Sequence, residues 1–326
     1  MAFMSDAAAL VPVVALVIAL LVDRYLGEPP ARLHPVVWMG NYLHWASSRI
    51  HPDPSPEVRD LKAFWLAALY WCAGAAMILI VAWALQWAAL QLLWYLAAPL
   101  LGLALKPTLA WAMLRREVQA VEDALGKSLE AGRERLSWLV SRDTTALSAS
   151  EVRESAIESL AENLNDSVVA PIFWFVLFGL PGAAVYRFAN TADAMWGYHG
   201  LRDGVNWEWA GKWAARADDV LSWVPARLTA LLLALVVGGL SFKALCSEAR
   251  KTPSPNSGWP MATMALALNI RLGKPGAYTL NAACKPPLAA DTAQAQEYAS
   301  KVVLAHVLLA LIAMFLIAFI KQGLLQ

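Results

Sequence analysis

Charged residues are scarce in this 326-residue chain: Asp, Glu, Lys and Arg make up 16% of it, against roughly 25% in ordinary soluble domains. Neither sign dominates, since 26 Lys and Arg stand against 25 Asp and Glu. This balance excludes a strongly basic nucleic-acid binder and an acidic disordered tail. The three cysteines are far apart, so neither a disulfide scaffold nor a Cys-x-x-Cys metal site is expected.

Several nucleotide and hydrolase motifs are also missing. The sequence contains no Walker loop, GxGxxG, HExxH or nucleophile elbow. Any nucleotide would therefore be held by arginines and a carboxylate-bound Mg²⁺ rather than by a glycine-rich loop.

Long uncharged runs take the place of the missing charges, and 59% of the residues are hydrophobic. These runs cover Ala7–Val22, Ala63–Leu105, Ser167–Tyr186, Leu228–Phe242 and Val302–Ile320. A membrane-spanning helix needs about 20 mainly apolar residues, so the 43 residues of Ala63–Leu105 predict two spans that meet near Gln86–Gln91. A soluble core helix would not stay uncharged for so long, because one of its faces meets water. The sequence therefore predicts an all-α, polytopic integral membrane helical bundle with five or six spans.

Two of these runs allow more than one interpretation. Ala7–Val22 has the length of a signal-peptide core, but no basic segment precedes it and Asp23-Arg24 follows in place of a small-residue cleavage site. This pattern favours a retained span. Ser167–Tyr186 is interrupted by prolines and glycines at positions 171, 179, 181 and 182. It forms either a complete span or a broken, re-entrant helix.

The distribution of basic residues predicts the orientation. The loops 23–62, 106–166 and 243–301 hold 20 Lys and Arg, whereas the N-terminus, the 187–219 loop and the C-terminal tail hold 5. The positive-inside rule places the three basic loops in the cytoplasm and both termini outside. If Ser167–Tyr186 is re-entrant, the 187–219 loop is cytoplasmic as well. We expect one membrane-embedded domain over residues 1–326, in the inner membrane of a bacterial-type cell, with a cytoplasmic-side active site.

The loops between the spans are predicted to be partly helical. Arg115–Trp138 mixes charged and apolar residues at helical spacing and is broken by glycines at positions 126 and 132. The prolines of the 250–290 segment predict an irregular structure, with a short buried helix over Met261–Ile270 and a turn at 273–276.

The helix that begins near Ser148 carries a row of acidic side chains. Ser148 and Glu151 fit a capping box, and the helix is expected to continue to about position 165. At 100° per residue, one arc of about 80° holds the glutamates at positions 151, 154, 158 and 162, with Asp166 about 40° beyond. The first two could simply favour the positive helix N-terminus. Glu162, Asn163 and Asp166 directly precede an apolar run, where unpaired carboxylates are costly, and their oxygens suit Mg²⁺.

A second polar cluster follows the run Ser167–Tyr186. Asn190 and Asp193 share one helix face at i,i+3 spacing. If the intervening run folds back, this pair faces the carboxylates that end the preceding helix and completes a metal-holding pocket. His199 could titrate near neutral pH, or it could be an ordinary interfacial hydrogen-bonding residue.

Two polar stretches outside these helices carry candidate ligand-binding residues. The segment 23–35, with Arg32 and His34, contains consecutive X-Pro steps that make it stiff and extended. It is either a ligand clamp at the membrane surface or a plain connector. Arg142, ahead of the capped helix, predicts an anion site together with free backbone N–H groups.

Two further arginines lie before the run Leu228–Phe242. Arg216 is either a ligand-binding residue or part of an ion-pair network with the aspartates that follow it. Arg227, next to the uncharged run, is either functional or snorkels to the headgroups. The residues alone therefore predict a polytopic membrane protein whose acidic, arginine-bearing site suits phosphate-containing substrates with Mg²⁺.

At these polar stretches the sequence resembles one family, the adenosylcobinamide-phosphate synthases of cobalamin biosynthesis (CobD/CbiB). The matching stretches read GEPP and HPVVWMG within 27–40, RDT from 142, ESLAENLND from 158, NTADAM from 190, ARADD from 215 and PSPNSGWP from 253. They span nearly the whole chain in the family's order, so the resemblance is more specific than any single motif. One departure is Gly211-Lys-Trp213, where the family more often has an aromatic and glycine-rich segment, and Lys212 is assigned no role.

The resemblance implies an ATP-driven amide synthesis. The corrinoid adenosylcobyric acid would be joined through a carboxyl group to the amine of (R)-1-aminopropan-2-ol phosphate, or of a similar amino-alcohol. An acyl phosphate would be the intermediate and adenosylcobinamide phosphate the product. ATP is then a co-substrate, and Mg²⁺ neutralises the charge of the transferring phosphoryl group.

On this basis each polar cluster receives an expected role. The expected metal ligands are Glu162, Asn163, Asp166, Asn190 and Asp193. The expected substrate and phosphate contacts are Arg32, Arg142, Arg187, Arg216, Arg227, Asn256, Trp259 and Lys274. Guanidinium groups match phosphate geometry, and the 253–276 loop with its tryptophan could close over the corrinoid. The expected catalytic groups are His34, Glu158, Glu162 and His199, with either histidine accepting the amine proton.

Two other classes of function stay open from the sequence. A membrane regulatory or sensory protein, like the relative involved in β-lactamase induction, would share the acidic helix but has no need for His34-Pro35, the 216–227 region and the 253–260 loop together. An intramembrane Mg²⁺-dependent transferase would carry repeated DxxD motifs, which only 162–166 and 190–193 approach. Besides its substrates and the lipid bilayer, the protein could bind a second copy of itself or other enzymes of the cobalamin pathway. No nucleic-acid partner is expected.

Overall fold

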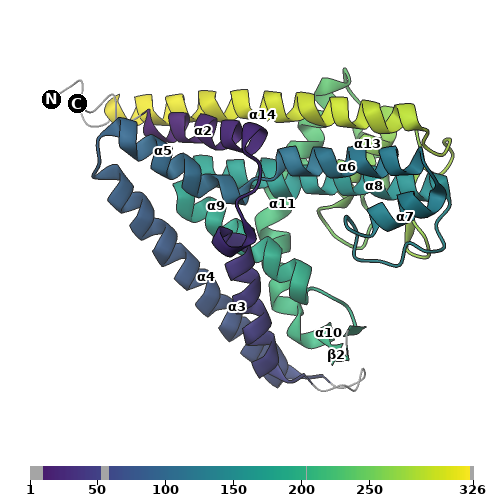
Figure 1. Ribbon diagram of the computed structural model, residues 1–326, viewed down its shortest axis with the longest axis horizontal. Coiled ribbons are helices and arrows are strands. Elements are labelled where there is room, and N and C mark those ends of the chain that lie inside the picture. The colour runs from purple at the N-terminus through teal and green to yellow at the C-terminus, as the bar shows by residue number, and fades with distance from the viewer. Residues whose placement is uncertain (1–9, 53–58, 203, 324–326) are drawn as a thin grey trace. The chain divides into compact units, whose positions relative to one another are not determined.

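The computed structural model describes residues 10–52, 59–202 and 204–323, and helices make up most of this part of the chain (Figure 1). Five of the described helical stretches are long and apolar enough to cross a membrane: Leu61–Leu90, Trp94–Leu125, Ala149–Trp196, Trp207–Val236 and Ala289–Ile320. The predicted all-α, multi-pass architecture is therefore confirmed. The start of the run Ala7–Val22, part of the 23–62 loop and one residue of the 187–219 loop lie outside the described residues.

The chain divides into two compact units, each made of segments that are far apart in the sequence. The first unit contains the residues up to Leu109, Ala170–Leu221 and the residues from Ala310 onward. The second unit contains Ala110–Val169 and Ser222–Leu309. The expectation of one membrane-embedded domain over residues 1–326 stays a prediction.

The first unit is built around helices from the N-terminal third of the chain. Its elements are α2 (Val11–Tyr25), the 3₁₀ turns η1 (Ala31–Leu33) and η2 (Lys106–Thr108), α3 (Pro35–Ile50), α4 (Leu61–Leu90), α5 (Trp94–Leu105), α9 (Ala170–Trp196), β1 (Leu201–Arg202), β2 (Val205–Asn206), α10 (Trp207–Ala210), and parts of α11 (Lys212–Val236) and α14 (Ala289–Gly323). α2 lies along α5, α4 lies along α9, and α3 packs against both α4 and α9. A Cβ on Gly102 of α5 would lie 2.8 Å from Cγ2 of Ile18 in α2, so the glycine allows these two helices to pack closely.

The helix boundaries in the apolar runs follow their polar and helix-breaking residues. α4 and α5 are separated at residues 91–93, so the predicted break near Gln86–Gln91 is confirmed. α9 is also broken where its glycines and prolines predict, since Gly179 has φ 68° and ψ −155°. The N–H of Leu180 donates to Oε1 of Gln86 at 2.8 Å, which satisfies a backbone donor within an apolar helix. The re-entrant path itself stays a prediction.

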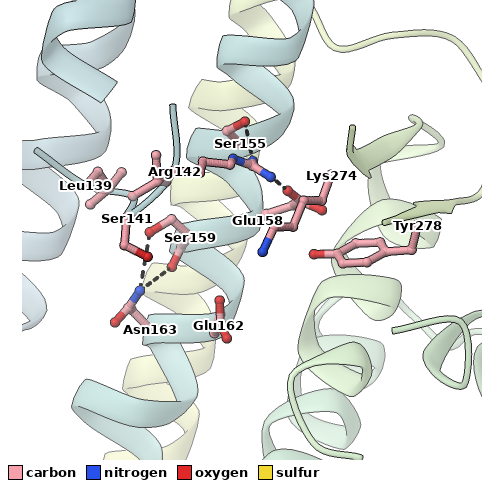
Figure 2. A pocket seen from close by; sticks show the side chains of 11 residues that line it. Leu139, Ser141, Arg142, Ser155, Glu158, Ser159, Glu162, Asn163, Lys274 and Tyr278 are labelled. Atoms are coloured by element: carbon pink, nitrogen blue, oxygen red, sulfur yellow. Dashed lines mark hydrogen bonds and ion pairs between the residues drawn. The ribbon is translucent and has the colours of Figure 1, made fainter. Parts of the chain in front are cut away.

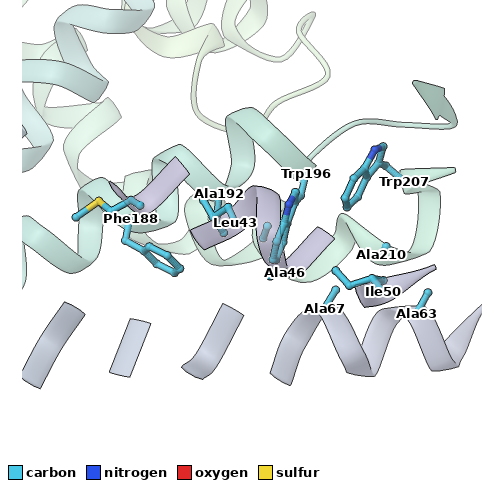
Figure 3. Close-up of a cluster of buried hydrophobic side chains, with 12 residues drawn as sticks. Leu43, Ala46, Ile50, Ala63, Ala67, Phe188, Ala192, Trp196, Trp207 and Ala210 are labelled. Atoms are coloured by element: carbon cyan, nitrogen blue, oxygen red, sulfur yellow. The ribbon is translucent and has the colours of Figure 1, made fainter. Parts of the chain in front are cut away.

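Alanines make up half of the hydrophobic core cluster of the first unit (Figure 3). The core cluster comprises Met39, Leu43, Ala46, Ile50, Ala63, Ala67, Phe188, Ala192, Trp196, Trp207, Ala210 and Ala214. Its alanines let the helix backbones approach closely, and Trp196 and Trp207 stack with ring centroids 6.0 Å apart. Because α3, α4, α9 and α10 share this core, the polar residues on α9 are held on a fixed helix.

The second unit contains the acidic helix and the segments that pack against it. Its elements are α6 (Trp111–Leu125), α7 (Leu129–Leu136), α8 (Ala149–Leu164), the π-helix η3 (Asn165–Val169), α12 (Phe242–Ala249), α13 (Gly258–Leu268), β3 (Leu272–Lys274), β4 (Tyr278–Leu280) and the remaining parts of α11 and α14. α8 packs against α6, α7, α13 and β3. β3 and β4 form an antiparallel hairpin in which Lys274 lies opposite Tyr278.

The boundaries predicted in this unit are largely confirmed. Ser148 and Glu151 form the expected capping box, and α8 ends at Leu164. The helix pair over residues 115–138 is present, but Gly132 lies inside α7 rather than at a break. The reason is packing, since a Cβ at Gly132 would collide with the Leu125 side chain. The predicted turn at 273–276 connects two strands that the sequence does not indicate, and α12 is likewise not predicted.

Candidate functional site

α8 and the β3–β4 hairpin border a small polar pocket in the second unit, called the α8 pocket below (Figure 2). Its volume is about 190 Å³. It is lined by Leu139, Val140, Ser141, Arg142, Ser155, Glu158, Ser159, Glu162, Asn163, Lys274 and Tyr278. The sequence predicts a role at the site for the lining residues at positions 142, 158, 162, 163 and 274. This pocket is therefore the first candidate for the active site.

The start of α8 decides which of its side chains face the pocket. The capping box fixes the helix at Ser148, and residues three or four positions apart then fall on one face. Ser155, Glu158 and Glu162 follow this spacing and line the pocket on successive turns (Figure 2). One local signal in the sequence therefore sets the register of the whole polar face.

The acidic row on α8 is divided among different partners. Glu151 belongs to the cap, where its Oε2 accepts from the N–H of Ser148 at 2.7 Å. Glu154 is 2% exposed and pairs with Arg271, whose Nη2 lies 2.9 Å from Oε1. Glu151 thus lies at the helix N-terminus, as one interpretation of the sequence expects, whereas the ion pair of Glu154 with Arg271 is not indicated by the sequence. Glu158 is the next glutamate along the row, and it faces the α8 pocket.

Arg142 and Glu158 form a charged wall of the pocket. Nη2 of Arg142 donates to Oγ of Ser155 at 2.5 Å and to Oε2 of Glu158 at 3.3 Å. Glu158 is only 4% exposed. Its other oxygen, Oε1, and Nε of Arg142 are buried, and neither makes a well-formed hydrogen bond with any described residue. Because buried polar atoms are normally paired, both atoms are available to a ligand.

Tyr278 is a pocket residue that no sequence pattern indicates. Its ring extends from β4 toward α8 (Figure 2). Burial, and then the negative charges of Glu158 and Glu162, raise the pKa of Tyr278, so the hydroxyl keeps its proton at physiological pH. The hydroxyl makes a long contact of 3.7 Å with the Met261 sulfur, which is a weak acceptor. A tyrosine shortly after a turn matches no motif, so only the fold reveals this residue.

The predicted metal ligands on α8 lie where the helix changes to a π-helix. η3 covers Asn165–Val169, and such π-helical turns are frequent at functional sites. The amide nitrogen of Asn165 donates to Oδ1 of Asp166 at 2.8 Å. The amide oxygen of Asn165 accepts from Oγ1 of Thr229 at 3.1 Å. Asp166 is therefore held in place by a buried hydrogen-bond chain that reaches α11.

The end of this π-helix contacts a buried histidine. His306 of α14 is 3% exposed, and its Nε2 lies 3.1 Å from the carbonyl oxygen of Val169. Its Nδ1 is buried without a hydrogen bond to any residue in the described part of the chain. His306 is an isolated polar residue in an otherwise apolar run, so the sequence around it forms no polar cluster that would indicate a site.

The donor atoms around η3 suit a hard cation. Glu162, Asn163 and Asp166 offer oxygen atoms, and Mg²⁺ is usually bound by one or two carboxylates plus substrate phosphates. The Asn163 amide nitrogen donates to the carbonyl and the hydroxyl of Ser159 at 3.0 and 3.2 Å, which leaves its amide oxygen as the ligand atom. No group of three or more His, Cys, Asp or Glu among the described residues is placed to hold a metal ion. A Mg²⁺ ion here would therefore need phosphate oxygens as further ligands.

The other expected metal ligands, Asn190 and Asp193, lie on α9 in the first unit. Arg187 precedes Asn190 by three residues, so the three side chains share one helix face. A Cβ at Gly197 would collide with Oδ1 of Asp193. Glycine at this position therefore allows the Asp193 carboxylate to keep its conformation. The expected convergence of this pair with the α8 carboxylates stays a prediction, because the two groups belong to different units.

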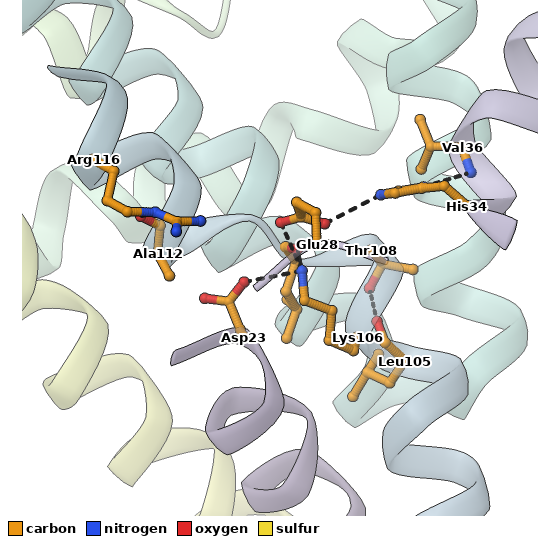
Figure 4. Close-up of polar contacts among 10 residues, drawn as sticks. Asp23, Glu28, His34, Val36, Leu105, Lys106, Thr108, Ala112 and Arg116 are labelled. Atoms are coloured by element: carbon orange, nitrogen blue, oxygen red, sulfur yellow. Dashed lines mark hydrogen bonds and ion pairs between the residues drawn. The ribbon is translucent and has the colours of Figure 1, made fainter. Parts of the chain in front are cut away.

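His34 belongs to a charged cluster in the first unit (Figure 4). Its Nδ1 accepts from the N–H of Val36 at 3.2 Å, which caps α3, and its Nε2 lies 3.1 Å from Oε2 of Glu28. Nζ of Lys106 lies 2.6 Å from Oε1 of Glu28 and 3.2 Å from Oδ1 of Asp23. Lys106 is 2% exposed and is a buried cation that no sequence motif indicates. Both nitrogens of His34 are engaged, so it could take the amine proton only by breaking one of these contacts.

Three expected site residues lie at the surface of the first unit. Arg32 is exposed in η1, and Arg216 is exposed on α11. The His199 side chain is 87% exposed, with Nδ1 3.2 Å from Oε2 of Glu208. Their roles in substrate binding and proton transfer stay predictions.

Three expected substrate-binding residues of the second unit contact one another. The Arg227 guanidinium lies over the rings of Trp223 and Trp259, 4.6 and 4.9 Å from their centroids. Its Nη1 donates to Oδ1 of Asn256 at 2.5 Å, and its Nη2 donates to the carbonyl of Pro255 at 3.0 Å. Cation–π contacts contribute about 0.5–2 kcal/mol each. Arg227 therefore fastens the proline-rich loop to α11, and this loop is where the corrinoid is expected.

A larger depression adjoins the α8 pocket. Its volume is about 610 Å³, and it is lined by Glu151, Glu154, Arg271, Gly273, Lys274, Pro275, Gly276, Ala277, Tyr278, Thr279 and Ala282. Lys274 and Tyr278 line both spaces. The β3–β4 hairpin thus borders a small and a large site, which suits a reaction that joins ligands of unequal size.

Comparison with known proteins gives a consistent result. The family described as CobD/Cbib protein matches residues 16–312. A probable cobalamin biosynthesis protein CobD from Methanothermobacter thermautotrophicus is 40% identical over 285 residues, which cover 82% of this chain and 86% of the relative. The corresponding protein of Thermococcus kodakarensis is 44% identical over 270 residues, covering 83% and 84%. The cobalamin biosynthesis protein CobD of Chromobacterium violaceum is 38% identical over 278 residues, covering 83% and 84%. No solved structure matches the chain.

Proposed function

Because the chain belongs to the CobD/CbiB family of cobalamin biosynthesis proteins, we propose that it is an ATP-dependent acid–amine ligase, an adenosylcobinamide-phosphate synthase. Its substrates are adenosylcobyric acid, (R)-1-aminopropan-2-ol phosphate or a similar amino-alcohol phosphate, and ATP with Mg²⁺. The observation that supports this most is the α8 pocket, where Arg142, Glu158, Glu162 and Lys274 face one space. Carboxylates and cations side by side are what an amine, a phosphate and a Mg²⁺ ion require.

The proposed reaction has two steps. The corrinoid carboxylate attacks the γ-phosphorus of ATP, which releases ADP and gives an acyl phosphate. The neutral amine then attacks the acyl carbon, phosphate leaves with one of the original carboxylate oxygens, and the amine proton passes to a base. Activation is needed because a free carboxylate offers an amine no leaving group.

The residues of the chain divide into binding and charge-neutralising groups. Glu162, Asn163 and Asp166 would hold Mg²⁺, which when bound neutralises charge on the phosphoryl oxygens. Asn190 and Asp193 on α9 stay expected metal ligands. The arginines at positions 32, 142, 187 and 216 and Lys274 would bind phosphate oxygens. Arg227 instead holds Asn256 and Trp259 in the loop expected at the corrinoid. His34 or His199 stays the expected proton acceptor.

The direct test is an assay on the purified chain in detergent or nanodiscs. With adenosylcobyric acid, the amino-alcohol phosphate, ATP and Mg²⁺, we expect ADP release that depends on both the corrinoid acid and the amine, with one amide formed per ADP. A sensory protein of the related kind would release no ADP. An intramembrane transferase would consume a lipid or alcohol phosphate and leave the corrinoid acid unchanged.

We further propose that the site opens to the cytoplasm, because the loops 23–62, 106–166 and 243–301 carry most of the basic residues and the cell's ATP is cytoplasmic. The test is cysteine labelling in whole cells, in a variant without the native Cys72, Cys246 and Cys284. A cysteine at the exposed Ser137 should react only with membrane-permeant maleimide. A cysteine at His199 should behave in the same way if α9 is re-entrant. Labelling of both positions from the periplasm would contradict a cytoplasmic site.

A further inference from the structure

We infer that the α8 pocket is the subsite for the amine substrate and that it recognises a small zwitterion carrying a primary ammonium and a phosphate monoester. This assignment rests on the proposed function, because that function requires an amino-alcohol phosphate. It goes further in placing this one substrate, rather than ATP or the corrinoid, against Glu158, Arg142 and Tyr278.

The size of the pocket limits what it can enclose. Its volume of about 190 Å³ is below the roughly 300–1,000 Å³ typical of ligand sites. A corrinoid or a whole nucleotide exceeds such a space, whereas a three-carbon amino-alcohol phosphate is the smallest of the three substrates. The adjoining depression of about 610 Å³ leaves room for a larger partner next to it.

The pocket has both a hydrogen-bond acceptor and a hydrogen-bond donor that are available to a ligand. Nε of Arg142 is a buried donor without a hydrogen-bond partner among the described residues, and the buried Oε1 of Glu158 keeps acceptor capacity beside the Tyr278 hydroxyl, which interacts with this carboxylate. A buried polar atom without a partner is unfavourable, and more so if it is charged. A ligand that relieves both costs has to offer a donor and an acceptor together, which a zwitterion does.

The ammonium end fits the acidic side of the pocket. A primary ammonium has three N–H donors and no acceptor. Glu158 offers Oε1, the hydroxyl of Tyr278 offers its oxygen, and Glu162 lines the same pocket. Tyr278 keeps its proton, so it adds an acceptor oxygen without a further negative charge.

The phosphate end fits the basic side. Arg142 is anchored at Ser155, which precedes Glu162 by seven residues, or about 10 Å along the helix axis. The guanidinium has five N–H donors, and its hydrogen bonds to Ser155 and Glu158 are both made by Nη2. Lys274 reaches the pocket from the hairpin (Figure 2) and makes no ion pair with any described residue. The pocket therefore offers cations, Arg142 and Lys274, beside carboxylates, Glu158 and Glu162, and an amino-alcohol phosphate carries a group to match each sign.

Other occupants fit this set of atoms less well. A triphosphate without its metal would bring several negative charges against Glu158, and like charges in contact are unfavourable. A lone Mg²⁺ ion would satisfy the carboxylates but leave Nε of Arg142 without an acceptor. The zwitterion is the ligand that balances both signs.

Calorimetry on the purified full chain in nanodiscs, without ATP or corrinoid, tests this inference. The probe is phosphoethanolamine, with ethyl phosphate lacking the amine and ethanolamine lacking the phosphate as comparisons. We expect phosphoethanolamine to bind at least about 10-fold more tightly than either, because each comparison leaves one charged wall unpaired. Equal affinity for phosphoethanolamine and ethyl phosphate would overturn the assignment.

Variants separate the two ends of the pocket. Glu158→Gln should weaken phosphoethanolamine about 10- to 100-fold, the loss expected for one hydrogen bond to a charged group, while ethyl phosphate binds unchanged or more tightly. Lys274→Met should weaken phosphoethanolamine and ethyl phosphate alike. Glu134→Gln, on the exposed surface of α7, is the matched control and should alter neither. If Glu158→Gln does not fold, Tyr278→Phe should still weaken phosphoethanolamine without affecting ethyl phosphate.

The outcome of this experiment can be told apart from that of the ligase assay. Zwitterion binding with the expected variant pattern but without amide synthesis would remove the proposed function and keep the subsite. Amide synthesis in which Glu158→Gln leaves the KM for the amine unchanged would keep the ligase and overturn the subsite.

Discussion

Replacing Asp166 or Asp193 by alanine is expected to reduce ATP-dependent amide formation by at least about 100-fold. Charge stabilisation by a bound metal is worth several kcal/mol, and each 1.36 kcal/mol is a factor of ten in rate. Asp166 lies in the π-helix next to Glu162, and Asp193 lies on the polar face of α9. Rates measured across a Mg²⁺ titration should show that excess metal restores little activity.

Stability has to be followed beside activity in these variants. Asp166→Ala removes the acceptor of the Asn165 amide, and an unsatisfied buried donor costs about 1–3 kcal/mol. Elution as a single species in detergent should therefore accompany each rate. Asp123→Ala on the exposed side of α6 is the matched control. Near-normal rates in both Asp166→Ala and Asp193→Ala would move the metal site elsewhere.

Lys106→Met is expected to destabilise the protein by about 3–5 kcal/mol, which is the usual cost of removing one member of a buried ion pair. Nζ of Lys106 contacts Glu28, Asp23 and the carbonyl of Leu109. Methionine fills the space but removes the cation that Asp23 and Glu28 share. Thermal unfolding in detergent, followed by circular dichroism, measures the loss.

The exposed Lys62→Met controls for the change in side-chain type and should leave the midpoint almost unchanged. Adding Asp23→Asn and Glu28→Gln to Lys106→Met should recover part of the stability, because the like charges are then removed. An unchanged midpoint for Lys106→Met would mean that the cluster does not hold the 23–34 segment in place.

The architecture was predictable because the bilayer imposes simple rules on a sequence. Uncharged runs of sufficient length indicate spans, and the breaks at residues 91–93 and at Gly179 follow from glutamines, glycines and prolines. The start of α8 was equally accessible, because a capping box is a local pattern. In each case a few neighbouring residues determine the outcome.

The polar site was predictable only in part. The sequence indicates Arg142, Glu158, Glu162, Asn163 and Lys274, and the structure places these in one pocket. It does not indicate which glutamates have structural partners, because Arg271 reaches Glu154 from a segment more than a hundred residues away. Such pairing is a property of the fold.

The sequence also fails to indicate three residues that the structure brings into polar surroundings: Tyr278, Lys106 and His306. Each is a single polar residue in a segment without a motif, and each acquires its surroundings only from distant segments. Arg227 is a different case, because the sequence marks it correctly as unusual but cannot distinguish a phosphate ligand from an anchor of the proline-rich loop. Type and spacing alone do not encode that difference.

The central claim, that this chain makes an amide through an ATP-derived acyl phosphate, is tested most directly with ¹⁸O in the reacting carboxyl group of adenosylcobyric acid. After turnover by the purified chain, mass spectrometry should find one ¹⁸O in the released phosphate for each amide formed, the other ¹⁸O in the amide carbonyl, and ADP as the nucleotide product. Unlabelled phosphate, release of AMP in place of ADP, or no amide at all would contradict it.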